Sequence, residues 1–80
     1  MPRDFYDIRN LLRDGINISV SAKNYDYYEL KKLAREAQES GASLRITDAE
    51  ELESYEIRRI SEEGGEMISF DFPEDEEDSN

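Results

Sequence analysis

One six-residue pattern occurs three times in this chain of 80 residues. The copies begin at Tyr6, Tyr28 and Tyr55, and each reads tyrosine, acid, aliphatic, two polar residues, aliphatic. Each copy is followed by a glycine and then by a run in which apolar and polar residues alternate. These glycines lie 26 and 24 residues apart. A repeat of this length predicts a stack of helix–strand units, each of which buries its apolar face only against its neighbours.

Local patterns place three helices and three strands in alternation along the chain. Apolar residues at helical spacing follow Asp4 and Asp26, whose carboxylates can accept hydrogen bonds from the free amides of a first helical turn. Ser54 is predicted to cap the third helix in the same way, and a glycine follows the last turn of each helix. The predicted helices span about 5–13, 27–40 and 54–63, and the predicted strands span 16–20, 42–46 and 67–72.

The predicted strands alternate between apolar and polar residues, which is typical of a sheet with one buried and one solvated face. Strands that are joined by helices are predicted to be parallel. The sequence therefore predicts an α/β fold, a short αβαβαβ repeat formed by residues 1–73 as a single domain. Three helices are expected on one face of a three-stranded parallel sheet, with the other face open. The strand residues predicted to face the helices are Ile16, Ile18, Val20, Leu44, Ile46, Ile68, Phe70 and Phe72.

The repeated tyrosines admit two interpretations. Residues that recur in a solenoid mostly pack one unit on the next, so Tyr6, Tyr28 and Tyr55 are predicted to lie between repeats. An aromatic ladder that binds a ligand is the alternative. The residues of the third helix predicted to face the core are Ile57, Ile60 and Ser61.

The segment Leu44–Leu52 resembles the leucine-rich repeat phrase L-x-L-x-x-[N/C]-x-x-L, with Ala49 in place of the usual asparagine or cysteine. Ile18–Ala22 is a shortened version of the phrase, with Tyr25 at the position of Leu52. The spacing of the repeats also fits the range of about 20–29 residues in that family. The resemblance covers residues 5–72 and implies helix–strand solenoid geometry. In the polar connection after the second strand, Leu52 is predicted to be the main apolar anchor and Ala49 a lesser one.

The net charge of −11 is concentrated in residues 48–80. Residues 1–47 contain seven acids and eight bases, whereas residues 48–80 contain fourteen acids and only two bases, Arg58 and Arg59. A negative field repels nucleic acid and anionic membranes and attracts basic protein surfaces. Neither direct nucleic-acid binding nor membrane binding is therefore expected. Residues 74–80 hold five acids and no apolar side chain, and they are predicted to form a disordered acidic tail.

Several function classes are disfavoured by composition. The chain has no cysteine and no histidine, so a serine nucleophile would lack an imidazole base, and enzymatic activity is not expected. No calcium-loop pattern occurs, and no metal or other cofactor is predicted. The N-terminus lacks the apolar core of a secretory signal, and no apolar run is long enough to span a bilayer. A cytoplasmic location is therefore predicted.

Two surfaces are candidates for partner binding. The open sheet face could anchor a carboxylate or an aromatic ring through its arginine, and the alternative is a solvated sheet of small polar residues that binds nothing. The acidic face has two competing interpretations: general solubility, or an electrostatic decoy that imitates the phosphate backbone. The residues predicted for the acidic face are Asp48, Glu50, Glu51, Glu53, Glu56, Glu62, Glu63 and Glu66. The residues predicted for the sheet face are Asn17, Ser19, Ser43, Arg45, Thr47, Ser69 and Asp71, and the alternation also places Ser21 and Met67 on this face.

In its small size, strong acidity and lack of cysteine, the chain resembles phage-encoded inhibitors of bacterial defence, such as anti-CRISPR proteins, many of which act as DNA mimics. The resemblance implies a viral inhibitor in the host cytoplasm, acting on a basic surface of a nucleic-acid-handling protein or complex. The alternative is a regulatory, adaptor or antitoxin-like module that binds a protein through the sheet face. A monomer is expected rather than a homodimer, although both outer strands have edges that could pair.

Overall fold

Helix and strand alternate three times in the computed structural model, which describes residues 3–73. The predicted α/β repeat is therefore confirmed, and the predicted acidic tail, residues 74–80, lies outside the described residues. Short 3-10 turns, η1 and η2, precede α3 and β3. The elements are α1 (Phe5–Arg13), β1 (Ile18–Ser21), α2 (Tyr27–Ser40), β2 (Leu44–Thr47), η1 (Ala49–Glu51), α3 (Ser54–Gly64), η2 (Gly65–Met67) and β3 (Ile68–Phe70).

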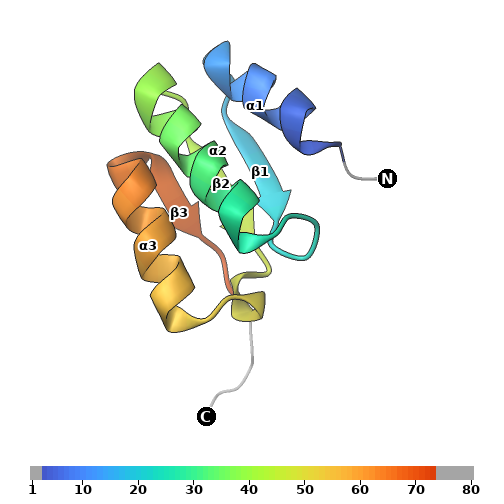
Figure 1. Ribbon diagram of the computed structural model, residues 1–80, viewed down its shortest axis with the longest axis vertical. Helices are drawn as coiled ribbons and strands as arrows, with labels where there is room; N and C mark the ends of the chain where they lie inside the picture. The colour runs from blue at the N-terminus through green and yellow to red at the C-terminus, as the bar shows by residue number, and fades with distance from the viewer. Residues whose placement is uncertain (1–2, 74–80) are drawn as a thin grey trace.

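The three strands form one parallel sheet in the order β1-β2-β3, and the helices cover one of its faces (Figure 1). All strands run toward the same end of the molecule, so all three helices begin at that end and run back (Figure 1). The register aligns Ile18 with Leu44 and Leu44 with Ile68 beneath the helices. This arrangement brings the first turns of the helices together with the loops that follow the strands.

The core lies between the sheet and the helices and is built from aliphatic side chains. Leu44 and Ile46 of the central strand are fully buried, as are Leu30 and Leu33 of α2. Ile60 of α3 is also fully buried. Because α2 packs on both other helices, it forms the centre of the helical layer.

Acidic residues at the helix starts hold the first turns in place. The Asp7 amide donates to Asp4 Oδ1 at 2.9 Å, and Asp26 and Glu29 form a reciprocal capping box at 2.8 and 3.0 Å. Both predicted caps are thus confirmed. The prediction that Ser54 caps α3 is wrong: Glu53 is the cap residue, and its amide donates to Glu56 Oε1 at 2.8 Å. The Glu56 carboxylate accepts from the amide of the cap residue, as the third helical position does in a capping box.

The strand ends differ from the sequence prediction. Ile16 is 45% exposed because β1 begins only at Ile18, after the turn in which Gly15 adopts a positive φ of 83°. Phe72 is 54% exposed because β3 ends at Phe70. Both residues were predicted to face the helices, and both predictions are wrong. The alternation of inward-facing and outward-facing side chains applies only to residues that lie within a β-strand.

Two further inward assignments need correction. Ala49 is fully buried whereas Leu52 is only partly buried, so their predicted roles are reversed. The cause is η1, which turns Ala49 toward the core while its amide donates to the carbonyl of Asp71 at 3.2 Å. Ser61 is exposed, so of the three α3 residues predicted to face the core only Ile57 and Ile60 do so.

Gly64 is required by packing at the end of α3. A Cβ atom at this buried position would lie 2.0 Å from Ile68 Cγ1 and 3.2 Å from Ala34 Cβ. We therefore expect Gly64→Ala to lower the free energy of unfolding by about 1–3 kcal/mol, the usual cost of overpacking. Urea unfolding measures the loss. In an Ile68→Ala background the same change should cost much less, and an undiminished cost there would exclude this contact as the cause.

No helix within residues 3–73 combines the length and the apolar character needed to cross a membrane.

Candidate functional site

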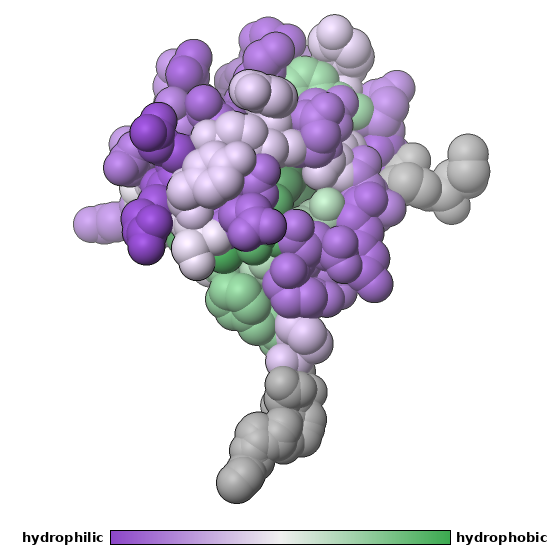
Figure 2. All heavy atoms as spheres, turned by 60° about the horizontal axis from the view of Figure 1, so that its bottom comes forward, coloured by the Kyte–Doolittle hydropathy of each residue, from purple (hydrophilic) through white to green (hydrophobic). Residues whose placement is uncertain are grey.

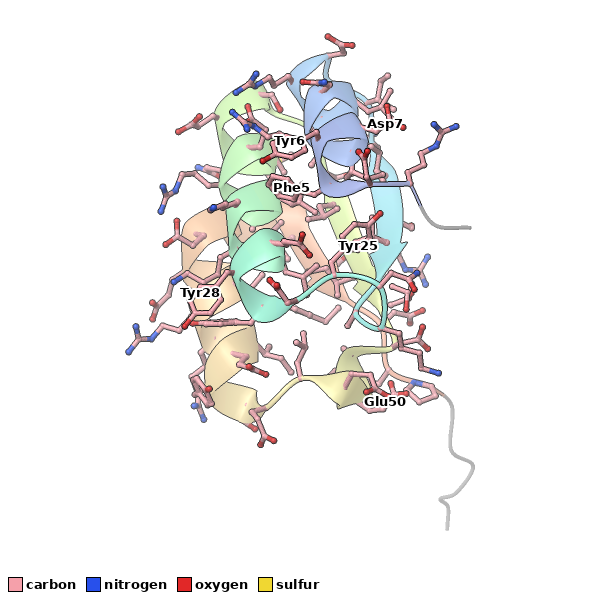
Figure 3. The ribbon with its side chains drawn as sticks, turned by 45° about the vertical axis from the view of Figure 1, so that its right-hand side comes forward. Phe5, Tyr6, Asp7, Tyr25, Tyr28 and Glu50 are labelled. Atoms are coloured by element: carbon pink, nitrogen blue, oxygen red, sulfur yellow. The ribbon has the colours of Figure 1, made fainter. Side chains whose placement is uncertain are left out.

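Carboxylates gather at the end of the molecule where the helices begin. Glu50 and Glu51 lie in η1, Glu53 precedes α3, and Glu56 lies in its first turn. Glu50, Glu51 and Glu53 are exposed, and none makes an ion pair within residues 3–73. Figure 3 shows Glu50 at this end of the ribbon. We call Asp48, Glu50, Glu51, Glu53 and Glu56 the acidic end.

Two members of the acidic end have structural tasks. Asp48 adopts a left-handed conformation, with φ 55°, and its Oδ2 accepts a hydrogen bond from Ser21 Oγ at 2.5 Å. Glu56 accepts from the Glu53 amide, as described above. Glu50 and Glu51 have no such contact, and Glu53, the cap residue of α3, makes no ion pair within residues 3–73. These three exposed carboxylates are therefore those available to a partner.

The remaining acids of the predicted face lie elsewhere. Glu62 and Glu63 are in the last turns of α3 and Glu66 follows in η2. An eleven-residue helix spans about 16 Å, so these acids sit at the opposite end of α3. Arg35 Nε lies 2.9 Å from Glu63 Oε1, and this hydrogen bond lowers the pKa of the Glu63 carboxyl. The predicted acidic face is thus two separate groups.

The repeated tyrosines are exposed and do not form a buried layer between the repeats. Tyr6, Tyr28 and Tyr55 are 66%, 68% and 57% exposed, so the packing prediction is wrong for Tyr6 and Tyr28, whereas Tyr55 contacts Tyr27 of α2. Each repeated tyrosine lies two positions before an aliphatic residue that faces the core. At 100° per residue, two positions correspond to about 200° around the helix, so the tyrosine faces away from the core. This signal was present in the sequence, because Ile8 and Leu30 follow Tyr6 and Tyr28 by that spacing.

Three tyrosines form a cluster across the first turns of α2 and α3. The ring centroid of Tyr27 lies 5.1 Å from that of Tyr28 and 6.1 Å from that of Tyr55. Lys31 Nζ lies over the rings of Tyr27 and Tyr28, at 5.1 and 6.0 Å from their centroids. Figure 3 shows Tyr28 projecting away from the helical layer. We call Tyr27, Tyr28 and Tyr55 the tyrosine cluster.

The acidic end and the tyrosine cluster adjoin each other. The charges of Glu56 and, more weakly, Glu53 raise the pKa of the Tyr55 phenol, because a carboxylate opposes formation of a phenolate nearby. Tyr55 therefore lies within the field of two carboxylates of the acidic end. Tyr25 plays a different part: it is buried, its hydroxyl donates to the carbonyl of Arg3, and burial raises its pKa.

The open face of the sheet carries a row of polar residues. The register places Ser19, Arg45 and Ser69 side by side across the three strands. Arg45 Nη2 donates to Asp71 Oδ2 at 2.9 Å, so the predicted sheet-face arginine already has a carboxylate partner. Asn17 is also engaged, accepting from the Ser43 amide at 2.9 Å.

Two other members of that face are placed differently. Thr47 is half-buried, and its hydroxyl donates to the Val20 carbonyl at 3.3 Å. Met67 lies in η2 and packs against the core, so it does not reach the open face where the alternation placed it.

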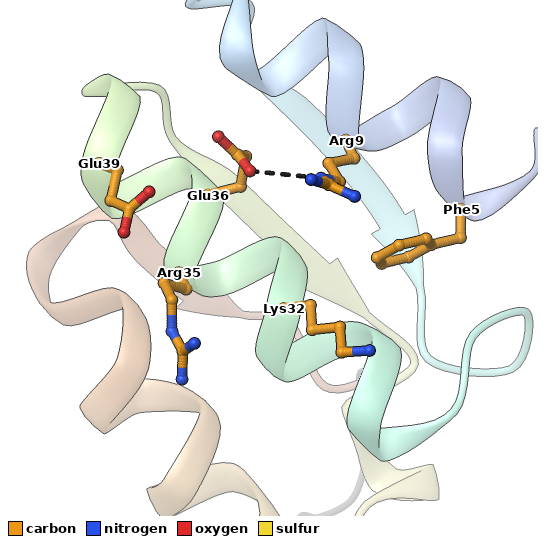
Figure 4. Close-up of a pocket in the computed structure, with 6 residues that line it drawn as sticks. All are labelled: Phe5, Arg9, Lys32, Arg35, Glu36 and Glu39. Atoms are coloured by element: carbon orange, nitrogen blue, oxygen red, sulfur yellow. Dashed lines mark ion pairs between the residues drawn. The ribbon is translucent and has the colours of Figure 1, made fainter.

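A cleft of about 300 Å³ lies between α1 and α2 (Figure 4). Its lining residues carry both signs of charge, and Arg9 Nε lies 3.5 Å from Glu36 Oε1. Arg13 reaches the other oxygen of Glu36 at 3.2 Å. These pairs tie α1 to α2 and leave the cleft with nearly balanced charge. The residues lining the cleft are Phe5, Arg9, Lys32, Arg35, Glu36 and Glu39.

Three surfaces of the described chain are thus open to a partner: the acidic end, the tyrosine cluster and the outer face of the sheet. The first two adjoin at the end of the molecule where the helices begin, and the third lies on the face of the sheet away from the helices (Figure 1). No family model, curated protein or solved structure matches the chain. The choice among the surfaces therefore depends on their exposure and charge.

Proposed function

We propose that this protein is a non-enzymatic inhibitor that binds a basic surface of a nucleic-acid-handling partner and blocks it by charge mimicry. The acidic end makes the contact. The observation that carries the proposal is the exposure of Glu50, Glu51 and Glu53 without ion-pair partners among residues 3–73. Charged groups in this state are not neutralised by an internal partner and attract a cationic surface.

The surroundings of the acidic end also support the proposal. Viewed from this end, hydrophilic groups flank paler and apolar surface (Figure 2). Phe72 is exposed, and Leu52 and Ile57 are half-buried. Five further acids follow Pro73 in the sequence. Carboxylates around an apolar centre suit a protein interface, which combines a buried centre with a charged rim.

The proposed contact would use the same attraction between opposite charges that brings a basic protein to DNA. Double-stranded DNA presents about one negative charge per 1.7 Å of its axis, and the proteins that bind it supply lysine and arginine. A rigid set of carboxylates can occupy the same basic surface. Because charge supplies most of the attraction, the affinity is expected to fall steeply as salt is added.

A second candidate function uses the outer face of the sheet. Its side chains are small except for Arg45, which is 57% exposed at the centre of the Ser19–Arg45–Ser69 row. A regulatory, adaptor or antitoxin-like module could bind a protein there. The Asp71 contact competes with an incoming carboxylate, which makes this candidate the weaker one.

The proposed function predicts competition with nucleic acid. Immobilised protein is used to capture partners from lysates of candidate host cells, and each captured protein is loaded with a labelled DNA or RNA duplex. Added chain is expected to displace the duplex, and the displacement should weaken with salt. Immobilised Ser19→Trp protein, in which only the sheet face is altered, should capture the partner as well as the wild type does. The same variant, when added, should displace the duplex equally well. Capture of a partner that keeps its duplex, or capture insensitive to salt, would contradict charge mimicry.

A further inference from the structure

The tyrosine cluster offers aromatic faces to solvent beside the acidic end. Tyr28 and Tyr55 are exposed and lie on either side of Tyr27, whose ring contacts both. Because Tyr27 is half-buried and packs against the core, it holds the cluster in place. Exposed tyrosines on rigid helices bind with little loss of side-chain entropy, which is why they are frequent at interface hot spots.

The cluster already contacts a cation within its own chain. Lys31 Nζ lies within about 6 Å of two ring centroids, the range in which a cation is attracted by the electrons of an aromatic face. Tyr55 lies further from that lysine, next to Glu53 and Glu56, whose charges act on its hydroxyl. The site therefore combines aromatic faces with carboxylates, and both attract cations.

We propose that the tyrosine cluster recognises arginine side chains of the partner, with the guanidinium stacked on Tyr28 or Tyr55 and paired with Glu53. This proposal rests on the proposed function. Arginine fits better than lysine because its planar group stacks on a ring and donates two parallel hydrogen bonds to a carboxylate. A nucleic-acid base could also stack on tyrosine, but its phosphates would be repelled by the adjoining acids. The occupant is thus an arginine-rich segment of a protein.

The test compares two peptides of equal charge. Fluorescein-labelled octaarginine and octalysine are titrated with the protein, and binding is followed by anisotropy. The wild type is expected to bind octaarginine roughly tenfold more tightly than octalysine. Tyr28→Ala with Tyr55→Ala should remove most of that preference and leave the octalysine affinity nearly unchanged. Tyr28→Phe with Tyr55→Phe should retain it, because the ring faces remain.

Tyr6→Ala is the matched control. Tyr6 is as exposed as Tyr28 but lies on α1, outside the cluster, so its removal should leave the preference intact. If both peptides bind with salt-sensitive affinity and the alanine pair keeps the preference, arginine recognition by the cluster is overturned while the proposed function stands. If neither peptide binds, the proposed function itself is contradicted.

Discussion

Changing Glu50, Glu51 and Glu53 together to lysine is expected to weaken octaarginine binding roughly 100-fold. Each exposed ion pair contributes about 0.5 kcal/mol. Three attractions are lost and three repulsions are gained, which amounts to about 3 kcal/mol. All three residues are exposed, so the fold should persist. Anisotropy titration at low salt measures the change, and circular dichroism checks the fold.

A control with the same net charge separates position from total charge. Asp14, Glu39 and Glu66 are exposed acids at the far ends of the helices. Changing these three to lysine should weaken octaarginine binding only several-fold, through the reduced long-range field. Equal losses in the two triple variants would mean that overall charge, and not the acidic end, determines binding.

The second large effect concerns stability. Leu44 is fully buried in the central strand, between Ile18 and Ile68 on the neighbouring strands. Leu44→Ala should lower the free energy of unfolding by about 2–5 kcal/mol, through lost burial and the cavity left behind. A domain of this size has a total stability of about 4–12 kcal/mol. We therefore expect a large drop in the urea midpoint and partial unfolding of the variant.

Ile16→Ala serves as the comparison for Leu44→Ala. The alternating pattern predicted that both side chains face the core, whereas the structure leaves Ile16 exposed before β1. The expected cost at Ile16 is less than about 1 kcal/mol. Similar losses at the two positions in chemical unfolding would place Ile16 in the core and contradict the start of β1 at Ile18.

The layered fold could be predicted because each local pattern agrees with the others. Leu44 and Ile46 alternate with polar residues, which permits one buried face only. Asp26 and Glu29 form the capping box that their spacing predicted. The burial predictions are wrong where a turn interrupts the regular pattern, as before β1 at Ile16 and in η1 at Ala49.

The candidate site could be predicted only in part. Fourteen acids among residues 48–80 indicated a negative surface, but not that α3 separates Glu50 from Glu62 by its own length. The contact between Tyr27 and Tyr55 was not predicted, because the repetition of Tyr55 suggested packing of one unit on the next. Tyr27 and Tyr55 are distant in sequence, and their contact depends on how α2 and α3 pack, which local patterns do not specify.

The location of the interface is the central claim, and an NMR titration tests it most directly. Octaarginine is added to ¹⁵N-labelled protein, and shifts of the backbone amides are followed as the peptide binds. We predict shifts concentrated at Glu50, Glu51, Glu53 and Tyr55, with little change at Ser19 and Arg45 on the opposite side of the sheet. Shifts concentrated at Ser19 and Arg45, with the acidic end unaffected, would contradict the account.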